Sequence, residues 1–506
     1  MERVRRRWWT WSVSVLAVLV ILAAAVSGLF QLAVLELPSY RDALSDWVTK
    51  VAGRSVEING VDLVWSGIHP RLDLSGITLY SEDGNDEVLS ADRLSLGFGL
   101  LRLATGDLMP DSIELSGLSL AVDVDDQGHV RIVGLDASPD VKPDYAQWLR
   151  QLEHFQHVRL LNCDLHVTAP QLPDVPLSLH LAQADFRKTL IGMSAQAHLD
   201  LPPSYGKSLD LAADLSGALD QPENWSGNLD AQVAQAQPQP WLRRWLQPGT
   251  RVGAGQAQLE LKGRLRSGQL TVVDLSLQSG PLLAAHAGQM TSAHTLELLA
   301  RATPASPGWQ MDIRRLALDG EEQLRGSLHY APLADGSGFD LDAQADLLRL
   351  GKLTPWLAYL REPPPALALA ARAGGDISGL VLRLHDSNAQ PQFLLRAVLK
   401  DFSYAAGDGP AGLSGLNGEV SADESSGRLQ LGGGGVTLNL PHAMRVPVPL
   451  DALTGTLQWS RRSDGWRVGL PDFTWRAAGT HGRGSVSLDL PGEAGQSPGL
   501  DLSANF

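Results

Sequence analysis

Alternation of apolar and polar residues dominates the chain from Val56 to its end. A β-strand points successive side chains to opposite faces, so this alternation predicts strands with one apolar and one solvated face. The 51 glycines and 30 prolines suit short strands joined by tight turns, as at Asp83-Gly84 and Asp335-Gly336. The predicted fold is mostly β: an elongated, repetitive, twisted antiparallel sheet with a few short helices. The clearest apolar positions of the pattern are Leu259, Leu261, Leu265, Leu341, Leu347, Val436, Leu438 and Leu440.

Two segments of this body repeat one another. Leu229-Asp230-Ala231-Gln232 precedes Pro240-Trp241-Leu242, and Leu341-Asp342-Ala343-Gln344 precedes Pro355-Trp356-Leu357. The offsets are 341 − 229 = 112 and 356 − 241 = 115 residues, so the two modules nearly superpose. We therefore expect a membrane-proximal β region over 36–228, a β module with a Pro-Trp-Leu helix over 229–340, and a second module over 341–506. The second module is expected to continue beyond Phe506, as the front part of a longer protein would.

The N-terminus carries a candidate membrane anchor. Residues 13–35 form an apolar run that would measure about 34 Å as a helix, enough to cross a hydrocarbon core. Arginines at positions 3 and 5–7 precede it, with Trp8, Trp9 and Trp11 at the boundary. This pattern predicts a single transmembrane helix, with residues 1–12 as a cytoplasmic basic tail and the body on the outer face. The alternative is a cleaved signal peptide, for which the small residues 23–28 offer a site.

A short amphipathic helix is predicted directly after the anchor. Ser39 is the candidate N-cap and Gly53 the stop, with apolar residues at helical spacing between them. This helix either lies on the membrane surface or packs on the first strands. Its apolar residues are Tyr40, Leu44, Trp47, Val48 and Val51.

Charge and composition exclude several classes of function. The net charge of −15 would repel a phosphate backbone, so nucleic acid is not an expected partner. The single cysteine, Cys163, allows no internal disulfide framework. The sequence contains no GxxxxGK[ST], HExxH or GxSxG motif, so we expect no enzyme activity and no cofactor. The glycine run at 432–435 lacks a phosphate-binding lysine and is interpreted as a turn or bulge.

Two weak metal motifs are present. The segment 123–128 opens like a calcium loop, but the position of its bidentate glutamate is occupied by Gly134, so we interpret it as a hairpin turn. His154, His157, Cys163 and His166 are the best transition-metal candidates, but their spacing matches no known ligand set. We therefore predict no metal site and assign these side chains to the surface or the core.

The membrane-proximal segment resembles the AsmA-like envelope proteins, and most closely their YhdP branch. Short motifs carry the resemblance in a fairly specific order along essentially the whole chain. They include Leu37-Pro38-Ser39-Tyr40-Arg41, Gly53-Arg54-Ser55-Val56, Trp65-Ser66-Gly67, Leu74-Ser75-Gly76-Ile77, Leu115-Ser116-Gly117-Leu118, Asn224-Trp225-Ser226-Gly227 and Pro447-Val448-Pro449-Leu450.

The resemblance implies a β-rich protein with an open hydrophobic groove, anchored in the inner membrane of a diderm bacterium with its body in the periplasm. It also implies non-enzymatic transport of phospholipid toward the outer membrane, with the eight apolar positions above as candidates for the lining and the helix of Tyr40 to Val51 as the entry. On the alternation alone, closed β-sandwiches would explain the same residues. A scaffold or assembly factor that binds inner- or outer-membrane proteins along exposed sheet edges remains the functional alternative.

Overall fold

The structure is a computed structural model that describes residues 56–66, 69–80, 87–99, 102, 110–125, 130–133, 155–169, 177–334, 336, 338–361, 370–387, 392–405, 412–439, 441, 444–492 and 499–505. The predicted membrane helix and the predicted helix of Tyr40 to Val51 lie outside these residues. Within the described ranges, no helix is both long enough and apolar enough to span a bilayer. The chain divides into two compact units: residues 1–202, 207–231 and 266–269 form the first, and residues 203–206, 232–265 and 270–506 form the second.

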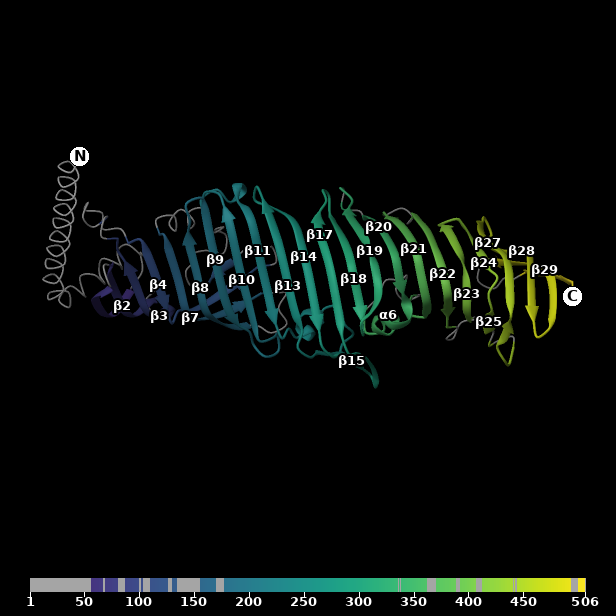
Figure 1. Ribbon diagram of the computed structural model, residues 1–506, viewed down its shortest axis with the longest axis horizontal. Helices are drawn as coiled ribbons and strands as arrows, with labels where there is room; N and C mark the ends of the chain where they lie inside the picture. The colour runs from purple at the N-terminus through teal and green to yellow at the C-terminus, as the bar shows by residue number, and fades with distance from the viewer. Residues whose placement is uncertain are drawn as a thin grey trace, which may run out of the picture. The chain divides into compact units, whose positions relative to one another are not determined.

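The first unit is a sheet of paired strands (Figure 1). Its elements are β1 (Val56–Ser66), β2 (His69–Tyr80), β3 (Glu87–Gly97), β4 (Ser112–Ser116), β5 (Ser119–Val124), β6 (Val130–Ile132), β7 (His157–Thr168), β8 (Leu177–Lys188), β9 (Gly192–Asp200), β10 (Ser208–Ser216), the 3-10 helix η2 (Pro222–Asn224) and the first part of β11 (Ser226–Ala234). The mostly β, antiparallel prediction is confirmed for most of the described pairs. It is wrong for β7, which pairs in parallel with β4 and with β5. A parallel pair needs a connection of a dozen or more residues, which the stretch from 125 to 156 supplies.

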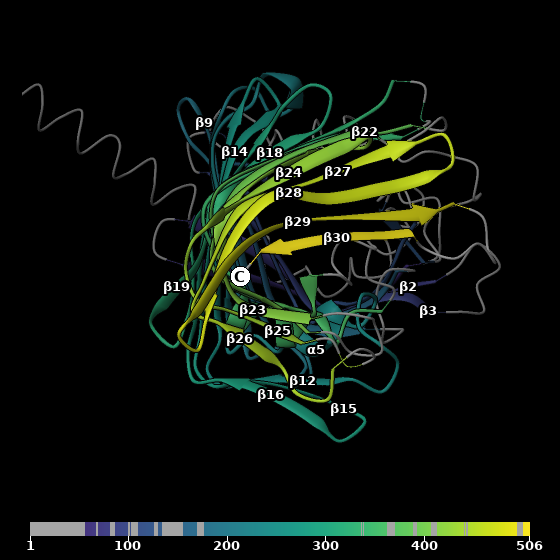
Figure 2. The same ribbon diagram turned by 90° about the vertical axis from the view of Figure 1, so that its right-hand side faces the viewer.

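The second unit continues the same design. Its strands are β12 (Arg251–Ala254), β13 (Gln258–Arg266), β14 (Gln269–Ser279), β15 (Leu282–His286), β16 (Gln289–Ala293), β17 (Leu296–Pro304), β18 (Trp309–Leu318), β19 (Glu321–Pro332), β20 (Phe339–Arg349), β21 (Ala373–Asp386), β22 (Gln392–Tyr404), β23 (Gly412–Asp423), β24 (Ser426–Gly432), β25 (Val436–Asn439), β26 (Val448–Leu450), β27 (Ala452–Arg462), β28 (Gly465–Ala477), β29 (Thr480–Pro491) and β30 (Gly499–Asn505). Two short helices, α5 (Pro238–Leu242) and α6 (Leu350–Leu357), carry the two Pro-Trp-Leu motifs. Figure 2 shows that β24, β27 and β28 are strongly curved.

Bulges interrupt many of these strands. Register shifts occur, for example, between Ile313 and Leu316 on β18, between Ser378 and Val381 on β21, and between Leu470 and Phe473 on β28. A bulge inserts an extra residue, bends the strand and increases its twist. Glycine supplies the required left-handed backbone at Gly379, where φ is 54°. Of the glycine run at 432–435, Gly432 ends β24 and the other three glycines connect it to β25 through a bend at Gly433, where φ is 79°.

The core of the first unit is apolar and tightly closed around Cys163, which is fully buried. Ala91 of β3, Leu118 between β4 and β5, Leu181 of β8 and Leu199 of β9 belong to the same buried cluster. Burial raises the pKa of the Cys163 thiol, so this side chain behaves as a small apolar residue.

A charged cluster lies on β7 and β8 of the same unit. Asp185 accepts hydrogen bonds from His157 at 3.0 Å, from Arg159 at 3.2 Å and from Arg187 at 2.7 Å. Burial alone raises the pKa of Asp185, but the hydrogen bonds from His157 and Arg187 outweigh it and lower the pKa to about 2. Arg159 also lies 3.6 Å from Glu114 on β4, so the cluster joins three strands.

Candidate functional site

Residues that lie directly opposite one another on neighbouring strands share a face of the sheet. In the second unit, such residues form rows that cross from β14 to β30. One row contains only apolar residues and glycine: Val273, Ala302, Met311, Leu328, Ala343, Leu382, Leu395, Ala422, Gly427, Trp459, Val468, Leu488 and Leu500.

A second row on the same face has the same composition. It consists of Leu277, Leu298, Leu316, Leu324, Leu348, Ile377, Leu399, Gly418, Leu431, Gly455, Phe473, Gly484 and Ala504. We call the face formed by these two rows the apolar face. Neither row contains a charged or hydrogen-bonding side chain other than the indole of Trp459.

The side chains of the apolar face are only partly buried. In the first row, Ala422 alone is buried, whereas Leu328, Leu382 and Leu395 are half-buried and Leu500 is exposed. At the edge of this face, Trp309 and Tyr330 lie opposite each other and remain 45% and 42% exposed. A residue that fills a closed sandwich is normally almost inaccessible to water. The apolar face therefore offers surface that a ligand can cover.

The opposite side of the same strands, the polar face, is charged. The row next to the first apolar row consists of Asp274, Arg301, Asp312, Ser327, Gln344, Val381, Arg396, Ser421, Arg428, Gln458, Gly469, Ser487 and Asp501. Bidentate hydrogen bonds from Arg301 to Asp274, at 2.7 and 2.8 Å, lower the pKa of that carboxyl and raise the pKa of the guanidinium. The side chains of the polar face are thus suited to contact with water, whereas those of the apolar face are not.

The predicted lining residues occupy different parts of the second unit. Leu341 belongs to the apolar face, because it lies opposite Tyr330 and Leu384. Leu347 does not follow the alternation predicted for it: a bulge precedes it, and it lies opposite Arg325 and Ser378. Its neighbour Leu348 takes the apolar position instead. The other predicted residues on β13 are half-buried and alternate with more polar neighbours: Leu259, Leu261 and Leu265.

The remaining predicted residues lie on β25 or outside the described chain. Val436 is buried opposite Leu450, and Leu438 lies opposite Leu413 and Val448. Leu440 and the predicted entry residues Tyr40, Leu44, Trp47, Val48 and Val51 fall outside the described residues.

Sequence reasoning missed most of the two apolar rows. Leu382 and Leu384 alternate with Val381, Arg383 and His385, so the period-two signal was available on β21. The pairing of Trp309 with Tyr330 had no such signal, because it depends on a strand register that the sequence alone does not state.

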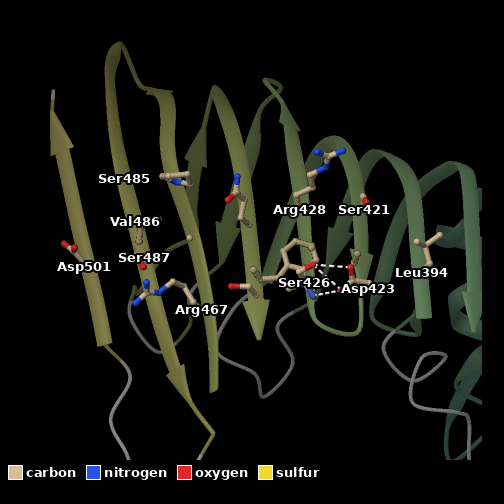
Figure 3. Close-up of a pocket in the computed structure, with 17 residues that line it drawn as sticks. Leu394, Ser421, Asp423, Ser426, Arg428, Arg467, Ser485, Val486, Ser487 and Asp501 are labelled. Carbon is tan, nitrogen blue, oxygen red and sulfur yellow. Dashed lines mark hydrogen bonds between the residues drawn. The ribbon is translucent and has the colours of Figure 1, made fainter. Parts of the chain in front are cut away.

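A hollow of about 830 Å³ is lined mainly by the polar face, by residues of β22 to β24 and β27 to β30 (Figure 3). Ser421, Arg428, Ser487 and Asp501 line it, and Asp423 holds its edge by accepting hydrogen bonds from Ser425 and Ser426. Arg467 in its wall is paired with Asp489 at 2.6 and 2.7 Å, which lowers the pKa of that carboxyl. Charged side chains in this lining, such as Arg428 and Asp501, make the hollow less suited to an acyl chain than the apolar face is.

The weak metal candidates have separate neighbours. His157 bonds to Asp185, His166 lies 3.3 Å from Ser178, and Cys163 is in the core; His154 is outside the described residues. In the described part of the chain, no group of three or more potential ligands could hold a metal ion.

Comparison with known proteins gives one family and one curated relative. The family model described as "YhdP protein" matches residues 1–506. The "Intermembrane phospholipid transporter YhdP" of Escherichia coli (strain K12) is 23% identical over 97% of this chain. The chain spans 39% of that relative's length. No solved structure matches the chain.

Proposed function

The chain belongs to the YhdP family, and on that premise we propose that it conducts phospholipid along the apolar face of its second unit, without catalysis. The observation that supports this most strongly is the pair of uninterrupted apolar rows from β14 to β30. Removing a sixteen-carbon acyl chain from a membrane costs about 12 kcal/mol at ~0.8 kcal/mol per methylene. A conduit must offset that cost with a continuous apolar surface, and one unpaired charge in it would cost several kcal/mol.

The apolar face suits the acyl chains of a phospholipid, and the surrounding water suits its headgroup. Acyl chains lie along the apolar rows and cross successive strands. The headgroup stays in water, outside the apolar face. The half-buried leucines favour this arrangement over a closed sandwich, because their exposed surface is available to an acyl chain. The relative's name, a transporter between membranes, agrees with such a role.

The location follows the same family premise. The helix of residues 13–35 would anchor the chain in the inner membrane with its N-terminus in the cytoplasm and its body in the periplasm. The helix of Tyr40 to Val51 would receive lipid from the outer leaflet of that membrane. Protein partners in the inner or outer membrane would complete the route.

Photocrosslinking at two neighbouring residues tests the proposal. A photoreactive amino acid replaces Leu382 on the apolar face in one variant and Val381 on the polar face in the other, in cells that contain labelled phospholipid. Both native residues are apolar and half-buried, so only the direction of the side chain differs. Lipid adducts at position 382 and none at 381 are expected.

Equal lipid labelling at both positions, or labelling at neither, would contradict transport along the apolar face. Stoichiometric protein adducts without lipid would instead favour the scaffold or assembly factor.

A further inference from the structure

A small satellite subdomain stands apart from the long strands of the second unit. It consists of the three-stranded sheet β12–β15–β16, helix α5 and the end of α6, which are brought together from three separate segments of the sequence. The Tyr359 hydroxyl donates to Thr291 Oγ1 at 3.0 Å, and the Gln247 side chain donates to the Ala358 carbonyl at 2.8 Å. Figures 1 and 2 show the β15–β16 hairpin projecting from the edge of the neighbouring strands.

The satellite presents an exposed turn, Trp241-Leu242-Arg243-Arg244-Trp245, which we call the tryptophan turn. Trp245 is 61% exposed and Trp241 53% exposed. Trp241 packs one edge on Tyr205, with ring centroids 5.5 Å apart, and leaves the rest of its indole outside. All five residues of the turn are exposed, which is unusual for a segment with two tryptophans and a leucine.

The turn is held firmly even though its outer side chains are exposed. Gln239 in α5 donates to the Thr250 carbonyl at 3.0 Å and accepts from the Val252 amide, which fixes the helix to β12. At the other end, the Arg361 amide donates to the Trp245 carbonyl at 2.7 Å. The exposure of the tryptophans is therefore set by the fold and not by a loose loop.

The charge of the satellite is opposite to that of the chain. Residues 231–259, 280–296 and 350–361 contain no aspartate or glutamate, although the whole chain has a net charge of −15. The first of these segments contributes Arg243, Arg244 and Arg251, all exposed, and none of the three forms an ion pair with a described residue. Basic residues beside exposed indoles are the combination that binds the headgroup layer of an anionic bilayer.

We propose that the tryptophan turn is a docking site for an anionic phospholipid surface. Trp241 and Trp245 insert their exposed edges into the headgroup layer, and Arg243, Arg244 and Arg251 contact the phosphates. The contact is a second point of membrane attachment, separate from the predicted anchor at 13–35. It does not depend on conduction along the apolar face.

A membrane fits this surface better than a folded protein does. A stable protein interface takes about 20 to 30 residues on each side, whereas the tryptophan turn and Arg251 together offer six exposed residues. A bilayer adapts to such a small patch, because two interfacial aromatic residues and three cations each act on it independently. The net charge of the chain elsewhere keeps the rest of the surface away from the same bilayer.

Vesicle capture by the full chain tests the docking site. The chain is held by its own N-terminal segment in nanodiscs of phosphatidylcholine, so that the predicted anchor is occupied. Vesicles of equimolar phosphatidylglycerol and phosphatidylcholine, or of phosphatidylcholine alone, are then added and floated. The wild type is expected to capture the anionic vesicles and not the neutral ones, with capture falling as salt is raised.

Two variants and one matched control carry the test. The double change Arg243→Gln with Arg244→Gln should weaken capture about 25-fold, at ~5-fold for each arginine. Trp245→Ala should weaken it at least about tenfold, and Trp245→Phe should restore part of the loss. The control, Arg461→Gln with Arg462→Gln, removes two adjacent exposed arginines from β27 and should leave capture unchanged.

Capture that is equal for neutral and anionic vesicles, or that survives the two variants, would overturn the proposal. Stoichiometric binding of a protein that Trp245→Ala abolishes, without vesicle capture, would replace the membrane by a protein partner. Lipid adducts at position 382 report separately on the apolar face. Absence of these adducts in a chain that still captures vesicles would count only against the conduction proposal.

Discussion

Replacing Leu382 by aspartate would place a carboxylate in the middle of the first apolar row. Leu382 lies opposite Ala343 on one side and Leu395 on the other, so a carboxylate there has no cation opposite it in the row. Because Leu382 is only half-buried, the carboxylate can keep its water and the sheet should still fold. The hydrated carboxylate would interrupt the apolar surface at β21.

The size of the effect follows from the spacing of the strands. About four methylenes of an acyl chain fit across one strand spacing of ~4.8 Å. At ~0.8 kcal/mol for each methylene, loss of contact with one strand costs an acyl chain about 3 kcal/mol. That corresponds to about a hundredfold lower occupancy of the apolar face at β21.

The assay is the yield of lipid adducts at a photoreactive residue in place of Leu395, measured in the Leu382→Asp background. The matched control is Val381→Asp, which introduces the same charge one residue away on the polar face. We expect the adduct yield to collapse in the first background and to persist in the second. Equal yields in the two backgrounds would refute the argument that acyl chains run along the apolar rows.

Three further predictions concern stability. The pKa of about 2 for Asp185 lies below that of an unfolded aspartate, so this carboxylate stabilises the fold by about 2 kcal/mol above pH ~4, and this stabilisation is lost as the pH falls toward 2. In urea unfolding, Asp185→Asn should remove both the stabilisation and its dependence on pH. Gly326→Ala would place a Cβ 2.1 Å from the Gln344 carbonyl oxygen, so it should separate β19 from β20 and lower the unfolding midpoint by an amount equivalent to about 1–3 kcal/mol. Arg467→Met should leave the free energy of unfolding nearly unchanged, because both partners of its ion pair are substantially exposed; a clear loss of stability in urea unfolding would show that the pair matters to the fold.

The sequence predicted the chemistry of the strands better than their arrangement. The alternation at 339–345 places Leu341, Ala343 and Ala345 on one face, as the register confirms. It could not predict the parallel pairing of β7 with β4 and β5, because both directions satisfy the same alternation. The long connection between β5 and β7 permits the parallel direction, which a short hairpin turn would exclude.

The candidate site was harder to predict than the fold. A continuous row requires the register of every strand pair, and a one-residue slip would exchange the two faces. The alternation of Leu382 with Val381 and Arg383 therefore indicated that one side of this strand is apolar. It did not indicate which residues of the neighbouring strands lie beside Leu382. The tryptophan turn shows the same limit: Trp241 was recognised as part of a repeat, but its exposure depends on contacts with distant segments at Thr250 and Arg361.

The bulges explain how strongly bent strands can still present one unbroken apolar face. An extra residue shifts the alternation by one, so a strand with strict period two would turn its apolar residues to the polar side beyond each bulge. At these positions the apolar residues are instead three apart: Ile313 and Leu316, Ala345 and Leu348, Ile377 and Leu380, Leu399 and Phe402, Leu470 and Phe473. The same spacing occurs in the first unit, where Leu160 and Cys163 pack into one core on either side of Asn162, whose φ is 51°. At these bulges, the departure from alternation in the sequence compensates the extra residue in the strand. The position of Leu347 follows from this rule. Because of the bulge before it, Leu348 lies on the apolar face and Leu347 lies opposite Arg325.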